Sequence, residues 1–176
     1  SARLAITADQ SYEVYLNGAY VCRGPARGFQ AHWPFDEIPV GPFLRRGRNV
    51  LAVRAYNPGC GNFQYVSAGA AGLLAALRIS RREICSDATW RARRQTGVQR
   101  DAEPASLQLP FQEYVDLRVE PADWMHPDFD DAAWTAPAAS AAWDVMPWHT
   151  LEPRGIPMLA EAEIPSGRIL GESEGA

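Results

Sequence analysis

An Asn-Gly pair at positions 17 and 18 constrains the fold of this chain more than any other feature. Before the pair, Tyr12, Val14 and Leu16 share one strand face, and after it residues 19–23 form a candidate return strand. A type I′ turn needs positive φ at both central residues, which Asn and Gly adopt most easily. The sequence therefore predicts a β-hairpin here, ended by the Gly-Pro pair at 24–25.

Further short strands are predicted where apolar residues recur with a period of two, over residues 50–56, 73–79 and 114–119. Residues 26–42 and 58–71 are predicted as long irregular loops, because Gly, Pro and aromatic residues interrupt any period. Residues 147–176 are predicted as an extended strap that frays after about Gly167. Short strands with turn signals between them, and almost no helical period, indicate an all-β, antiparallel β-sandwich.

The amino-acid composition limits the classes of partner that this chain can be expected to bind. The net charge of −4 argues against non-specific nucleic-acid binding, and no stretch approaches 18 apolar residues, so no membrane span is predicted. The three cysteines, Cys22, Cys60 and Cys85, are far apart and form no CxxC pair, which favours free and mostly buried thiols over a disulfide or zinc site.

No catalytic constellation stands out. The three histidines are scattered, and the chain has no HExxH, GxSxG or P-loop motif. Carboxylates are plentiful enough for two to meet as a glycosidase pair, an alternative that the sequence leaves open. The acidic cluster Asp128, Asp130 and Asp131 lacks the spacing of a calcium loop, and we interpret it as a helical turn that holds Trp134 in the core. Trp90 and Trp124 are also predicted to be largely buried. No metal site or cofactor is predicted.

Five stretches carry a family resemblance. They are the segment around Asp9, Tyr12 and residues 15–18, then residues 44–53, 86–91, 112–134 and 147–159. In this order they resemble the N-terminal β-sandwich module of bacterial α-L-rhamnosidases, glycoside hydrolase family seventy-eight. The resemblance implies a galactose-binding-domain-like jelly roll at residues 1–146, followed by the strap at 147–176 toward a downstream domain.

The resemblance also bears on function. The family's catalytic acids belong to an (α/α)₆ barrel downstream of this region, which implies that this chain is a non-catalytic accessory domain with the catalytic domain of its parent hydrolase as intramolecular partner. Some similar modules bind rhamnose with calcium, and others only support the barrel. The alternatives are a stand-alone carbohydrate-binding module for rhamnose-containing glycans and a protein-interaction sandwich unrelated to sugars.

A candidate carbohydrate site follows from the two predicted loops. Aromatic rings stack on the C–H faces of sugars, and planar polar groups bond the hydroxyls. The candidate residues are Arg27, His32, Trp33, Asn62 and Tyr65. In one interpretation Trp33 or Tyr65 is an exposed platform, and in the other these rings seal the end of the sandwich core.

Overall fold

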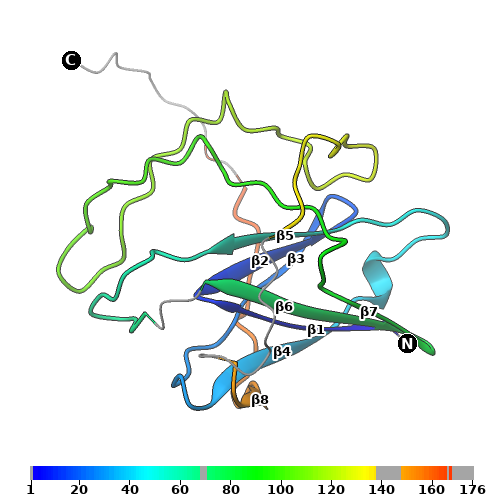
Figure 1. Cartoon of the computed structure of the whole chain (residues 1–176), viewed down its shortest axis with the longest axis horizontal. Helices are drawn as coiled ribbons and strands as arrows, with labels where there is room; N and C mark the ends of the chain where they lie inside the picture. Colours follow the sequence, from blue (N-terminus) through cyan, green and yellow to red (C-terminus); the bar gives the residue numbers. More distant parts are fainter. Residues whose placement is uncertain (1, 68–70, 138–147, 166, 168–176) are drawn as a thin grey trace.

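The computed structural model describes residues 2–67, 71–137, 148–165 and 167. The strands are β1 (Ala2–Asp9), β2 (Ser11–Leu16), β3 (Ala19–Gly24), β4 (Trp33–Pro39), β5 (Leu51–Tyr56), β6 (Gly72–Ile79), β7 (Arg82–Cys85) and β8 (Leu151–Pro153), with one 3-10 helix, η1 (Gly41–Phe43). They form a five-stranded sheet in the order β7-β6-β1-β4-β8 and a three-stranded sheet in the order β3-β2-β5. Figure 1 shows the two sheets as separate layers. The all-β prediction is confirmed, and the arrangement is compatible with a jelly roll.

The predicted hairpin is present as β2 and β3. Asn17 and Gly18 both adopt positive φ, at 55° and 87°. The Asn17 side chain also holds the turn against the start of β5, because its Nδ2 donates to the carbonyl of Phe43 at 2.9 Å and its Oδ1 accepts from Val50 N at 3.0 Å. Asn17 therefore serves both the local turn and the packing of the hairpin.

The core lies between the two sheets and consists of the side chains that point inward from their strands. Every second side chain of β2 is buried, as the alternation predicted. The facing residues of the larger sheet come from β1, the end of β4 and β6. The buried cluster comprises Leu4, Ile6, Ala8, Tyr12, Val14, Leu16, Cys22, Ile38, Val40, Ala75 and Leu77.

The prediction of one irregular loop over residues 26–42 is wrong for its second half. Residues 33–39 form β4, an interior strand of the larger sheet that pairs antiparallel with β1 and parallel with the edge strand β8. The sequence did not predict this strand because it contains Pro34 and Pro39, and proline lacks the backbone N–H that normally donates a hydrogen bond to a neighbouring strand. The parallel β4–β8 pair makes this sheet mixed rather than purely antiparallel.

The segment from residue 91 to residue 135 has no strands, only isolated bridges such as Val98 with Val115. The predicted strand at 114–119 is therefore wrong. The predicted helical turn near Trp134 is a plain turn, closed by Trp134 N donating to Asp131 O at 2.8 Å. This segment lies on the outer side of the smaller sheet (Figure 1), where Trp124 makes an edge contact with Tyr15.

The three tryptophans of this region are less buried than the sequence suggested. Trp90, Trp124 and Trp134 are each half-buried. Trp124 and Trp134 stack with ring centroids 6.4 Å apart, and Trp90 packs at the edge of the core. They attach a covering loop to the sandwich instead of filling its centre.

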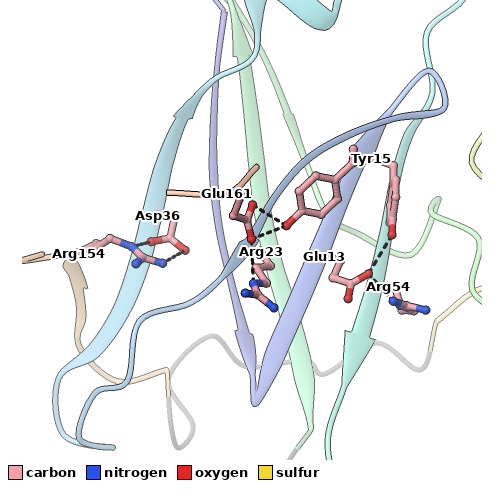
Figure 2. Close-up of polar contacts among 8 residues, drawn as sticks. Glu13, Tyr15, Arg23, Asp36, Arg54, Arg154 and Glu161 are labelled. Atoms are coloured by element: carbon pink, nitrogen blue, oxygen red, sulfur yellow. Dashed lines mark hydrogen bonds and ion pairs between the residues drawn. The ribbon is translucent and has the colours of Figure 1, made fainter. Parts of the chain in front are cut away.

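Residues 148–165, here called the strap, tie the two sheets together along one side. After β8, Arg154 forms a two-pronged ion pair with the buried carboxylate of Asp36 on β4, as Figure 2 shows. Farther along, Glu161 accepts hydrogen bonds from Tyr20 and pairs with Arg23 on β3 at 2.8 Å. The strap thus spans from the larger sheet to the smaller one. The predicted boundary at 146/147 lies outside the described residues.

The thiols differ from the prediction of mostly buried cysteines. Cys22 is buried in the core, whereas Cys60 and Cys85 are exposed, and all three are free. Burial raises the pKa of the Cys22 thiol to about 12. Within the described residues, no helix is long and apolar enough to cross a membrane.

Candidate functional site

Two of the predicted site residues, Trp33 and Tyr65, lie together at the end of β1. Their side chains are only 6% and 8% exposed. The Trp33 indole donates to the carbonyl of Ala8 at 3.3 Å and meets Trp148 of the strap edge-on. The exposed-platform interpretation is therefore wrong for both rings, and they seal the end of the sandwich instead.

The hydroxyl of Tyr65 is hydrogen-bonded to the buried carboxylate of Asp9, the last residue of β1. Tyr65 donates to Asp9 Oδ1, and Asn57 Nδ2 donates both to the Tyr65 hydroxyl at 3.3 Å and to the Asp9 carbonyl at 3.0 Å. The second carboxylate oxygen, Asp9 Oδ2, is buried with no hydrogen-bond partner among the described residues, and so is Oε1 of the adjacent Gln10. Two neighbouring residues thus each present an unpaired buried acceptor.

Two buried acceptors without hydrogen-bond donors lower the stability of the folded chain. A buried acceptor without a donor loses its hydration and gains nothing in return, about 1–3 kcal/mol for each group. Burial raises the pKa of Asp9 above its usual value, and the hydrogen bond from Tyr65 only partly opposes this. Burial together with Asp9 raises the pKa of Tyr65 to about 12, so Tyr65 stays a donor at neutral pH. Buried polar groups that the fold leaves unpaired favour a ligand that supplies donors.

The other predicted residues point to different partners. Arg27 is exposed, and its Nη2 donates to Gln64 Oε1 at 2.6 Å. Asn62 shapes the same loop, since its Oδ1 accepts from Gln64 N at 2.8 Å. His32 is directed to the strap, where its Nδ1 lies 2.6 Å from Glu152 Oε1. The structure therefore links Arg27 to the loop that holds Asn62 and Tyr65, and pairs the His32 side chain with Glu152 of the strap.

The residues at the end of β1 were tested as a calcium site. Calcium takes six to eight oxygen ligands. The unpaired oxygens of Asp9 and Gln10 are of the right chemical type. However, no group of three or more His, Cys, Asp or Glu side chains gathers anywhere in the described ranges. The described side chains therefore supply a carboxylate and an amide oxygen, and the other ligands of a calcium ion there would be backbone carbonyls or water.

Sequence reasoning missed Asp9 and Gln10 as site residues. Asp9 had drawn attention only as part of a family motif, although an acid at the end of an otherwise apolar strand is itself a signal. The partner of the Asp9 carboxylate is Tyr65, which is 56 residues away in the sequence.

Residues 1–157 match the family model described as the alpha-L-rhamnosidase N-terminal domain. The chain belongs to this family. An alpha-L-rhamnosidase of Streptomyces avermitilis is 32% identical to this N-terminal domain over 157 residues. Among solved structures, the GH78 rhamnosidase of Bacillus sp. GL1 aligns with 89% of the chain at 36% identity and a TM-score of 0.79.

A structure of the Streptomyces avermitilis alpha-L-rhamnosidase complexed with L-rhamnose aligns with 84% of the chain, at 31% identity and a TM-score of 0.54. The chain spans only a small part of these relatives, 12% of the Streptomyces protein and 17% of the Bacillus chain. The domain is thus one building block of larger glycoside hydrolases in these bacteria.

Proposed function

We propose that this domain is a non-catalytic accessory module of an α-L-rhamnosidase and packs on the catalytic part of that enzyme. The family match over residues 1–157 carries this proposal, because the matched part makes up only 12% of the Streptomyces protein and 17% of the Bacillus chain. The two buried carboxylates of the described residues are held inside the fold, since Asp36 pairs with Arg154 and one oxygen of Asp9 accepts from Tyr65.

Two apolar surfaces support the packing role. The strap exposes Ile156, Met158, Leu159 and Ile164 to solvent. The outer face of the five-stranded sheet holds a shallow cavity of about 400 Å³, with small and apolar side chains such as Ala5, Leu74 and Ala76 in its lining. Exposed apolar surface of this kind marks contact with other protein.

The test of the non-catalytic role uses the purified 176-residue chain and an aryl α-L-rhamnoside. We expect no turnover above the buffer control. Turnover that is lost on substitution of a single Asp or Glu would contradict the proposal, because it would place the catalytic acid within this chain.

A second function, carbohydrate binding at the end of β1, is favoured by the unpaired oxygens of Asp9 and Gln10. Sugar hydroxyls are donors that match such acceptors, and the Streptomyces relative was solved with L-rhamnose. We propose that Asp9 and Gln10 accept hydroxyl hydrogen bonds from a terminal rhamnose, with Asn57 and Tyr65 holding the carboxylate in place.

The binding test is a calorimetric titration of L-rhamnose into the chain, with and without calcium. We expect a dissociation constant between micromolar and millimolar, because few hydrogen bonds on a small ligand limit the affinity. Asp9→Asn removes the charge and should weaken binding at least tenfold, whereas the exposed control Asp128→Asn should not. Equal affinity of the Asp9 variant and the unmodified chain would contradict the proposed site.

A further inference from the structure

Three loop tips are tied together next to the proposed rhamnose site. Arg27 Nη2 donates to Gln64 Oε1 at 2.6 Å, and Gln30 Nε2 donates to the carbonyl of Val66 at 2.7 Å. Gln64 Nε2 in turn donates to the carbonyl of Gln108 at 2.6 Å. The oxygen and the nitrogen of the Gln64 side-chain amide are therefore both hydrogen-bonded. These bonds hold the segments 27–30, 62–66 and 106–109 together as one surface. In Figure 1 the loop after β5 and the loop near residue 108 lie at the same end of the molecule.

This surface presents two aromatic rings to solvent. Phe29 is 87% exposed and Phe63 is 70% exposed, each on a separate one of the tied loops. Val66 and Leu107, which lie on two of the tied segments, are exposed as well. A fully exposed phenylalanine gains nothing for folding, and the two rings are the kind of flat apolar surface that a ligand can cover.

The polar groups on the two segments that carry the rings are mainly guanidinium and amide groups, and His32, which is bridged to Phe29, is held by Glu152. Residues 26–30 and 61–67 contain one Arg, two Gln and one Asn but no acid and no lysine. Guanidinium and amide groups are planar and bond hydroxyls without needing an ionic partner. Exposed rings among such groups favour a neutral, hydroxyl-rich ligand, which describes a sugar better than a charged protein surface.

The surface is linked to the proposed rhamnose site through Tyr65. Tyr65 lies between Gln64 and Val66, which hold the loops, and its own hydroxyl donates to Asp9. We propose that Phe29 and Phe63 form a second sugar subsite, which takes the residue linked to the rhamnose bound at Asp9. This inference rests on the carbohydrate-binding function proposed above. It assigns the domain to rhamnose-containing oligosaccharides, whose C6 methyl groups add apolar surface for contact with the rings.

The test compares L-rhamnose with a rhamnose trisaccharide by calorimetry on the 176-residue chain. The trisaccharide should bind about tenfold more tightly, since covering part of one or two aromatic rings yields roughly that factor. Phe29→Ala and Phe63→Ala should each remove most of this gain and leave the affinity for L-rhamnose unchanged. Phe29→Trp should retain the gain, because it keeps an aromatic face. Leu117→Ala, at an exposed apolar position on the 91–135 segment, is the matched control and should alter neither affinity.

The outcomes separate the two proposals. If L-rhamnose binds in an Asp9-dependent manner but the trisaccharide binds no more tightly, or if the Phe variants retain the gain, the second subsite is refuted and the rhamnose site stands. If neither sugar binds the unmodified chain, both proposals are refuted, and the rings are then assigned to a protein contact.

Discussion

Replacing Arg154 with Met removes the cation that balances the buried carboxylate of Asp36. Asp36 is 1% exposed and the Arg154 side chain is 11% exposed, so water cannot take the place of the guanidinium. Tyr12 also donates to Asp36, and burial, together with this hydrogen bond, raises the pKa of Tyr12 above its usual value. The variant therefore leaves a buried anion with a neutral donor and no counter-ion.

The size of the effect follows from the burial of the pair. Breaking a buried ion pair by removing one partner costs about 3–5 kcal/mol, out of a total stability of about 5–15 kcal/mol for a typical domain. With a urea dependence of about 2 kcal/mol per molar, the midpoint of unfolding should fall by about 2 M. Tryptophan fluorescence is a suitable readout, because Trp33 and Trp148 lie in the cluster sealed by the strap.

Two comparisons make the result interpretable. Arg78 pairs with Glu83 on the surface, with side chains 68% and 46% exposed, so Arg78→Met should leave the urea midpoint almost unchanged. In the double variant Asp36→Asn with Arg154→Met, most of the loss should be recovered, because Tyr12 still has an acceptor and no charge is buried. A loss below about 1 kcal/mol for Arg154→Met alone would refute the reasoning.

Three more predictions follow from burial. In the native chain a thiol reagent should label Cys60 and Cys85 within minutes and Cys22 only after denaturation, since burial raises the pKa of Cys22 to about 12; rapid labelling of three thiols would count against this. Asp9→Asn should raise the melting temperature at pH 7, because burial disfavours the ionised form and raises the pKa of Asp9. The gain should shrink as the pH falls through that pKa and protonation removes the cost from the unmodified chain; a gain that grows in acid would contradict the assignment. Gly24→Ala should be destabilising, by about 1–3 kcal/mol in a urea titration, because the added Cβ would collide with the Tyr12 and Asp36 side chains; unchanged stability would show that this contact can relax.

Local signals predicted the parts of the fold that local forces determine. The Asn17-Gly18 turn and the strands near residues 50–56 and 73–79 were found because their conformations follow from turn chemistry and alternation. Strand β4 was missed because its two prolines are unfavourable locally, and only pairing with β1 and β8 makes it a strand. The opposite error at 114–119 arose because alternation without a partner strand does not form a sheet.

In the candidate site, too, the sequence predicted what depends on local composition and missed what depends on tertiary packing. The sequence indicated the loops from which Arg27, Asn62 and Tyr65 come, because aromatic and amide residues concentrate there. It gave no sign that Trp33 and Tyr65 would turn inward, since their burial depends on Trp148 from the strap. The unpaired oxygens at Asp9 and Gln10 depend on the same packing and are visible only in three dimensions.

The strap has a practical consequence for anyone who wishes to produce this domain alone. A gene fragment that stopped near residue 146 would omit β8, and the edge of β4 would be open to pair with another molecule. The fragment would also lack Arg154 and Glu161, so its Asp36 would be buried without a cation. Such a fragment should aggregate through the open edge of β4, whereas one that extends past Glu161 should remain monomeric. Light scattering of the two fragments at equal concentration would show the difference.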